Sequence, residues 1–159
     1  MNRLQALLEQ YSLPVIVVAI ILIIAAIAIP NLLRSRIVAN QASAVGSLRI
    51  INTAEVTYSS TFNAGYSPDL VSLGPGSSGS PTASAAGLID SVLASGVKSG
   101  YQFTYSATSL GGRYTDYRVN ANPLIVGSTG QNYYFTEQSG VIRQNTTATA
   151  SAPDSPIGG

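Results

Sequence analysis

The chain has 159 residues, of which only 9% are charged, and its formal net charge is +1. So small a charge provides no field that would steer nucleic acid or an acidic substrate to the protein. The sequence contains no histidine and no cysteine, which removes the commonest general base, the commonest metal ligands and every thiol nucleophile. We therefore expect no enzyme activity, no cofactor and no nucleic-acid partner.

Residues 1–12 form an N-terminal lead segment, and residues 13–33 follow it as an apolar segment. From Leu13 to Ile29 the chain reads LPVIVVAIILIIAAIAI, without a charged or hydrogen-bonding side chain. About twenty such residues in a helix cross the ~30 Å hydrocarbon layer of a bilayer. A buried core helix or a cleaved signal peptide are the alternatives, but the rest of the chain is too polar to enclose this run, and it is longer than a usual signal core. We predict a membrane helix that kinks or loosens over residues 26–30, because Pro30 removes a main-chain bond.

Residues 34–63 keep the helical period but are amphipathic, so we expect a second half of the same helix. Polar residues, among them Asn52 and Glu55, are assigned to the face opposite the apolar stripe. The helix is expected to end near Gly65, which can adopt a left-handed cap conformation. The residues expected to pack the head domain on this helix are Leu48, Ile51, Tyr58 and Phe62.

Residues 64–144 are predicted to form a globular α+β head. Ser67 is expected to cap one short helix, and a second is expected around Leu88 to Leu93, before Gly96. Residues 74–86 are rich in Gly and Ser and predict a flexible, exposed loop, bare or carrying glycan. Alternating apolar and polar residues with glycine-containing turns predict a small antiparallel sheet covered by the amphipathic helix. The four predicted strands are 101–108, 113–121, 132–137 and 141–144, and residues 145–159 are expected to be a flexible C-terminal tail.

Three stretches carry a resemblance to a known family. Residues 17–58, VVAIILIIAAIAIPNLLRSRIVANQASAVGSLRIINTAEVTY, strongly resemble the N-terminal region of type IV pilins and type II secretion pseudopilins. Residues 66–74, YSPDLVSLG, and 132–144, NYYFTEQSGVIRQ, are similar to downstream parts of the same proteins. The resemblance implies the pilin ladle fold, in which a long N-terminal helix packs its second half on a four-stranded antiparallel sheet.

The resemblance also implies a function. The subunit would wait in the inner membrane of a bacterium, be extracted by the pilus assembly machinery, and polymerise with copies of itself into an extracellular surface filament. In family filaments the helix often melts around the proline, which corresponds here to residues 22–31. The residues expected to pack in the filament core are Val17, Ile20, Ile21, Ile24, Ile27 and Pro30.

The N-terminal sequence departs from the family pattern. Matching Pro30 to the family's proline places prepilin cleavage between Leu8 and Glu9, where the family has Gly and usually Phe, and places Leu13 where the family has a glutamate. Two alternatives stand beside the pilus subunit, and the departing N-terminus motivates the second of them. One is a pseudopilin of a secretion system, a class that commonly binds calcium through acidic groups near the C-terminus, where this chain has only Asp154. The other is a membrane-anchored binding module that does not polymerise.

Overall fold

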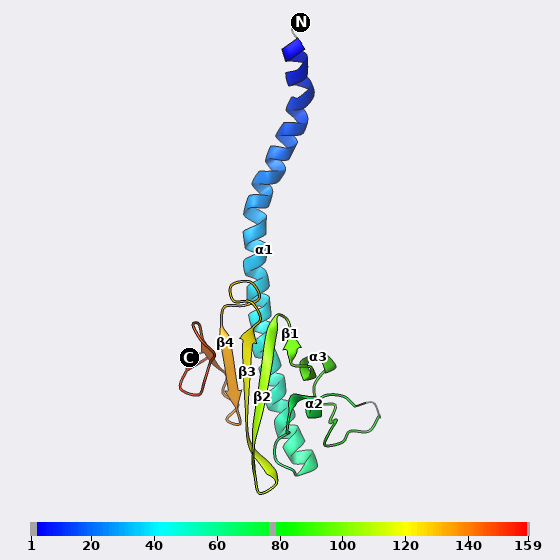
Figure 1. Ribbon diagram of the computed structural model, residues 1–159, viewed down its shortest axis with the longest axis vertical. Coiled ribbons are helices and arrows are strands. Elements are labelled where there is room, and N and C mark those ends of the chain that lie inside the picture. The colour runs from blue at the N-terminus through cyan, green and yellow to red at the C-terminus, as the bar shows by residue number, and fades with distance from the viewer. Residues whose placement is uncertain (1–2, 77–78, 159) are drawn as a thin grey trace. The chain divides into compact units, whose positions relative to one another are not determined.

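The computed structural model describes residues 3–76 and 79–158, in two units, Met1–Arg36 and Ile37–Gly159. Helix α1 (Arg3–Phe62) is by far the longest element, and the short helices are α2 (Leu70–Leu73) and α3 (Ser91–Ala94) (Figure 1). The strands are β1 (Val97–Lys98), β2 (Tyr101–Leu110), β3 (Arg113–Pro123), β4 (Tyr133–Glu137), β5 (Arg143–Asn145) and β6 (Ser155–Pro156).

In the first unit, α1 is helical at every described residue and contains Pro14 and Pro30. The helix is assigned without a break over residues 26–30, where a kink or loosening is expected. A proline removes one main-chain bond, whereas the residues around it keep theirs, so a helix can continue past the position. Residues 1 and 2 of the predicted lead segment lie outside the described residues.

The second unit contains an antiparallel sheet, so the prediction of a helix packed on an antiparallel sheet is confirmed. The expected number of strands is wrong, because the described residues form six strands in the order β1-β2-β3-β4-β5-β6. The four predicted strands correspond to β2 to β5. The two additional strands are the edges of the sheet, and each is only two residues long. A two-residue strand is too short to show the alternation from which strands are predicted.

The β2–β3 hairpin is the longest part of the sheet. Phe103 pairs with Ala121 and Tyr105 pairs with Val119, which places their side chains in register on one face. Gly111 and Gly112 form the turn with φ of 61° and 83°, which matches the left-handed conformation that tight hairpin turns require. The buried residues of the two strands are Tyr101, Phe103, Tyr117, Val119, Ala121 and Pro123.

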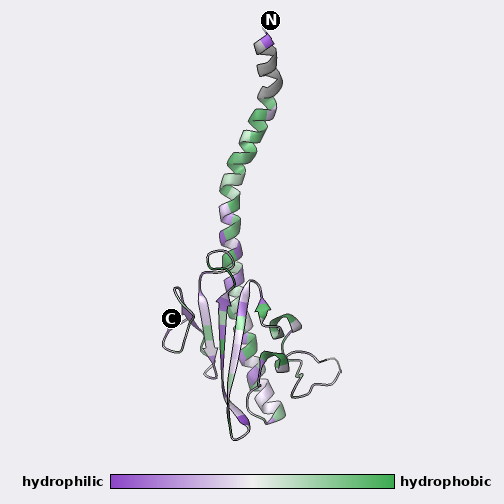
Figure 2. Ribbon diagram, viewed as in Figure 1, coloured by the Kyte–Doolittle hydropathy of each residue, from purple (hydrophilic) through white to green (hydrophobic). Residues whose placement is uncertain are grey.

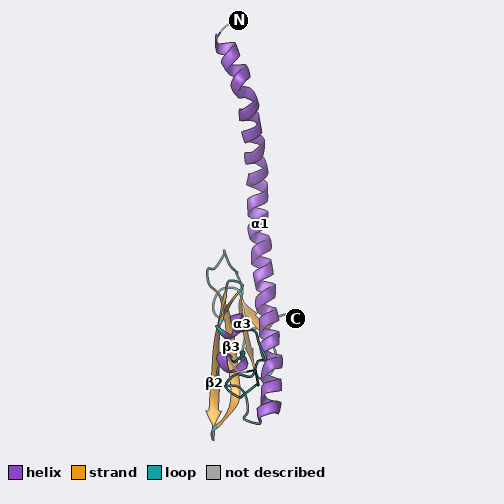
Figure 3. Cartoon of the chain, turned by 90° about the vertical axis from the view of Figure 1, so that its right-hand side faces the viewer, coloured by secondary structure: helices purple, strands orange, loops and turns teal. Residues whose placement is uncertain are grey.

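The second half of α1 covers this face of the sheet, as two views of the head show (Figures 1 and 3). Leu48, Ile51 and Tyr58 are buried in the common core, and Phe62 packs against its border. The rings of Tyr58 and Phe62 are 4.9 Å apart, within the range in which aromatic side chains attract each other. Helix and sheet thus bury each other's apolar surface.

The connection after α1 differs from the expected cap. Asp69, not Ser67, is the N-cap of α2, and its carboxylate accepts a 2.8 Å hydrogen bond from the Ser72 amide. The predicted loop 74–86 is anchored near its end, since the Tyr58 hydroxyl donates to the Ala83 carbonyl and Ala86 is buried. Residues 77–78 of this loop lie outside the described residues.

The segment after residue 145 also differs from the expected flexible tail. Strand β6 pairs with β5, and Ala150 is buried. Asp154 accepts hydrogen bonds from the Ser151 amide at 2.7 Å and from Asn145 Nδ2 at 2.9 Å, and its carbonyl accepts one from Arg143 Nη1. These polar contacts order a segment whose composition contains too few apolar residues to predict it.

Candidate functional site: the apolar half of helix α1

Residues 13–33 form the apolar half of α1, and their side chains are exposed throughout except at Ala25, which is partly covered. Figure 2 shows this part of the helix as an almost continuous hydrophobic surface. The five aliphatic residues predicted for the filament core are 51–63% exposed, and Pro30 is exposed as well. The five are Val17, Ile20, Ile21, Ile24 and Ile27.

The apolar half of α1 has no polar face that it could turn toward solvent. Among the described residues, α1 is the one helix long and apolar enough to cross a membrane, and none of its most apolar window is buried in the chain itself. A helix that is hydrophobic on all sides is stable in lipid or among other such helices. Most of its main-chain groups can pair within the helix, as an apolar medium demands, and the exception at Pro30 is the missing bond to the carbonyl of Ala26. The arrangement can bind lipid tails or like helices, and offers no chemistry beyond that.

The second half of α1 presents a different surface. Here the apolar stripe faces the sheet, and the residues predicted to pack the head lie in it, with Leu48 and Ile51 fully buried. The adjacent residue Ile50 is 45% exposed. The head therefore covers the apolar stripe of this half of the helix, whereas the described side chains of residues 13–33 are exposed almost throughout.

Glu55 is the most unusual residue of the second half, because it is fully buried rather than on the polar face. Its Oε2 accepts a 2.9 Å hydrogen bond from the Ser67 amide, and its Oε1 accepts hydrogen bonds from Ser67 Oγ at 2.5 Å and Tyr105 Oη at 2.7 Å. The carboxyl group thus joins the helix to the connection after it and to β2. Ser67, expected to cap a helix, serves instead as a partner of Glu55.

Burial raises the pKa of the Glu55 carboxyl, and the hydrogen bonds from Ser67 and Tyr105 oppose this effect only in part. Both hydroxyls also lie within hydrogen-bond distance of main-chain carbonyls, Ser67 Oγ of Asp69 and Tyr105 Oη of Ser67. When Glu55 is protonated, each hydroxyl can donate to its carbonyl, and one hydroxyl oxygen can accept a hydrogen bond from the carboxyl O–H group. The cluster is therefore satisfied in both protonation states. Burial, and then the Glu55 carboxylate, raise the pKa of Tyr105 far above its ordinary value.

The sequence contained a signal for this burial that the polar-face assignment missed. Glu55 lies four residues after Ile51 and three before Tyr58, so it belongs to the same helical stripe as these core residues. Asn52, also assigned to the polar face, contacts the sheet, where its Oδ1 accepts a 2.9 Å hydrogen bond from Tyr117 Oη and its Nδ2 donates to Thr136 Oγ1. Both side chains attach the helix to the head.

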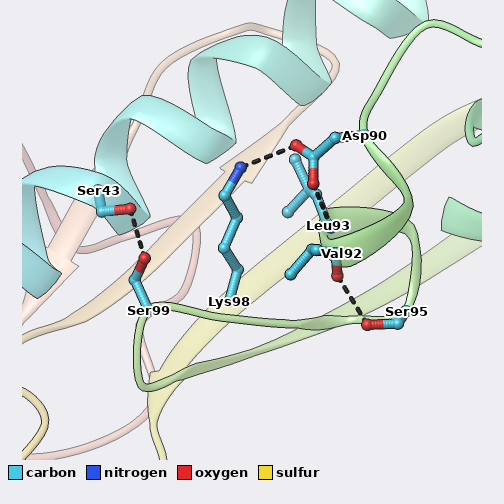
Figure 4. Close-up of polar contacts among 7 residues, drawn as sticks. All are labelled: Ser43, Asp90, Val92, Leu93, Ser95, Lys98 and Ser99. Carbon is cyan, nitrogen blue, oxygen red and sulfur yellow. Dashed lines mark hydrogen bonds and ion pairs between the residues drawn. The ribbon is translucent and has the colours of Figure 1, made fainter.

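A further set of polar contacts holds the β1 edge of the sheet to α1 and α3 (Figure 4). Ser43 Oγ on α1 donates to Ser99 Oγ at 2.8 Å, and Lys98 Nζ forms a 2.8 Å ion pair with Asp90 Oδ2. The hydrogen bond from Lys98 is the main cause that lowers the pKa of Asp90, which also caps α3 by accepting from the Leu93 amide. These contacts are partly exposed to solvent, and their role is to hold β1 and α3 in place.

No group of three or more Asp and Glu side chains in the described part of the chain is placed to hold a metal ion. Asp154, the acidic residue near the C-terminus, is engaged with Ser151 and Asn145. Comparison with known proteins adds no relative: no family matches the chain, and no curated protein or solved structure is significantly similar to it.

Proposed function

We propose that this protein is the structural subunit of a type IV pilus-like extracellular filament and polymerises through the apolar half of α1. The observation that carries the proposal is the exposed apolar surface of residues 13–33. The long helix packed on a small antiparallel sheet supports the ladle fold of pilins, although the sheet has six strands among the described residues.

The energetics of such a helix favour a cycle between membrane and filament. A helix of this kind has on the order of 1,500 Å² of apolar surface, and at ~25 cal/mol per Å² its removal from water is worth tens of kcal/mol. Lipid and a bundle of like helices both remove that surface from water, so transfer between them costs little hydrophobic free energy. The subunit accordingly resides in the inner membrane, and the assembly machinery then transfers it to a filament outside the cell.

Two other functions are alternatives to this proposal. The unmatched cleavage site at Leu8 and Glu9 and the apolar Leu13 favour a membrane-anchored module that does not polymerise. The pseudopilin alternative shares the helix and sheet, but calcium binding receives no support from Asp154, whose carboxylate is occupied by donors of the chain itself.

Assembly of the full chain tests the proposal directly. The purified protein, kept in detergent and then freed of it, is expected to form filaments of uniform diameter that electron microscopy detects. A chain that stays monomeric after detergent removal contradicts the proposal and supports the membrane-anchored module. A calcium-dependent rise in melting temperature, abolished by chelator, would favour the pseudopilin.

A further inference from the structure

The loop between β3 and β4, residues 124–132, has an exposed apolar tip. Leu124, Ile125 and Val126 are 51%, 62% and 58% exposed and follow one another in the sequence. No charged residue occurs between Arg118 and Glu137, so the tip has no acidic or basic neighbour along the chain. Consecutive exposed aliphatic residues without charge indicate a contact surface.

The base of this loop is fixed to the first residues of α1 in the second unit. Asn40 Nδ2 donates a 2.9 Å hydrogen bond to the Thr129 carbonyl. Gly130 lies so close to Tyr101 that an added Cβ would be 2.1 Å from the Tyr101 hydroxyl oxygen, so only glycine fits there. Figure 1 shows the loop beside α1, at the end of the sheet opposite the β2–β3 turn. The tip is thus held at the end of the head where the chain enters from the apolar half of α1.

Several amides of the loop donate hydrogen bonds within the chain. The amides of Ser128 and Thr129 both donate to the Ile125 carbonyl, and the Ile125 amide donates to Thr129 Oγ1 at 3.0 Å. The amides of Leu124 and Gly127 donate to the carbonyls of Gly100 and Gly130. An apolar medium leaves an unpaired amide unsatisfied at a high cost, so a loop that enters such a medium must pair its amides internally. This loop meets that demand at both ends of its aliphatic tip.

We propose that Leu124, Ile125 and Val126 insert into the lipid interface while the protein resides in the membrane. The inference rests on the proposed function, in which residues 13–33 span the bilayer. Asn40, which holds the loop, is seven residues after Leu33, and seven residues of chain reach at most ~25 Å. The loop is therefore tethered near the membrane surface on the side of the head.

The composition of the tip favours lipid over a protein partner. Protein interfaces depend on aromatic and arginine side chains at their centres, and Leu and Val are under-represented there. The tip has neither an aromatic nor a charged residue, and the amides of Leu124 and Ile125 and the Ile125 carbonyl are already used within the chain. Moving such a surface from water into hydrocarbon is favourable, because its aliphatic side chains need no hydrogen-bond partners there.

The natural chain contains no tryptophan, so a single tryptophan reports on one position. The full-length variant Ile125→Trp is reconstituted in vesicles of phosphatidylcholine and phosphatidylglycerol, with or without bromine on the acyl chains. Leu110→Trp is the matched control, because Leu110 is 74% exposed in the turn region between β2 and β3, at the other end of the sheet. We expect brominated lipid to quench the Ile125→Trp emission several-fold more strongly than the Leu110→Trp emission. The emission maximum of Ile125→Trp should also lie at a shorter wavelength than that of Leu110→Trp.

Equal quenching of the two variants, in vesicles from which alkaline carbonate does not extract the protein, overturns the lipid contact and leaves the membrane-spanning helix intact. A blue shift of the Ile125→Trp emission that appears only when filaments form overturns it as well, and identifies a second copy as the occupant. If carbonate extracts the natural chain from the vesicles, the protein does not span the membrane. That result contradicts both the membrane step of the proposed function and the lipid contact.

Discussion

The two halves of helix α1 share one main-chain conformation and differ in what surrounds them. Residues 13–33 expose isoleucine, valine and leucine on every side, whereas residues 44–58 place a narrow apolar stripe against the sheet. The second half also uses Asn52 and Glu55 to hydrogen-bond the head. The second half of the helix is stabilised by packing against its own domain. The first half needs an apolar environment, either lipid or other helices, to cover its surface.

The largest expected effect contrasts two neighbouring isoleucines. Replacing Ile51, fully buried, by Ala should lower the free energy of unfolding of the head by about 2–5 kcal/mol, because it leaves a cavity in the core. Replacing Ile50 by Ala should change it by less than ~0.5 kcal/mol. Denaturant titration of the full chain in detergent, followed by the near-ultraviolet dichroism of the tyrosines, measures both. Similar losses in the two variants would show that the second half of the helix is packed on both sides.

A charge in the apolar half should have its effect outside the head. Ile24→Lys places a charge near the middle of the proposed membrane segment, at a cost of about 2.5–3.5 kcal/mol for membrane insertion. We expect a loss of membrane retention and of filaments with an unchanged unfolding midpoint of the head. Val56→Lys, at a position that is exposed on the second half, is the control and should stay in the membrane fraction. Normal filaments from Ile24→Lys would contradict the role given to the apolar half.

The buried carboxyl of Glu55 should make the second half sensitive to pH. Since burial raises its pKa in the folded state, the native protein binds a proton more tightly than the unfolded chain. This contribution is fully present below the ordinary pKa of 4.5 and is lost as the pH rises through the folded pKa, with a slope of up to about 1.4 kcal/mol per pH unit. Unfolding midpoints measured across that range should fall for the natural chain and stay level for Glu55→Gln.

A separate effect has the opposite sign at lower pH. The pKa values of Asp90 and Asp154 are lowered by hydrogen bonds, mainly from Lys98 and from the Ser151 amide, so their contributions are lost as the pH falls below 3.8, the ordinary value. A natural chain whose stability rises with pH above 4.5 would show that Glu55 is ionised without penalty in the fold.

The smallest effect concerns the connection that follows the helix. Asp69→Ala removes the cap of α2 and should destabilise the head by about 1 kcal/mol. Asp69→Asn keeps a side-chain oxygen for the Ser72 amide and should retain most of the stability. The two unfolding midpoints give the comparison. An equal loss in both variants would assign the effect to the charge of Asp69 rather than to its hydrogen bonds.

The sequence was sufficient to predict the long helix, from an apolar run followed by a helical apolar period, and the strands β2 to β4, from alternating residues. The segment that contains β5 was predicted from the glycine-containing turn before it, since Arg143–Asn145 is polar throughout. The sequence was insufficient for β1 and β6, which are too short to have a period, and for the ordered segment around Asp154, which depends on polar contacts. Glu55 was assigned to the polar face of the helix because it is charged, although its spacing from Ile51 and Tyr58 places it in the apolar stripe. Burial of a carboxyl depends on partners from Ser67 and Tyr105, and helical spacing alone does not reveal them.

The packing of α1 along the sheet has a mechanical consequence. The contacts between helix and head extend from Asn40 to Phe62, about 33 Å of helix. A pull on the N-terminal half is carried into the head by an unbroken helix, and sliding it out would require many of these contacts to give way together. A chain without a single cysteine can in this way withstand tension without a covalent cross-link.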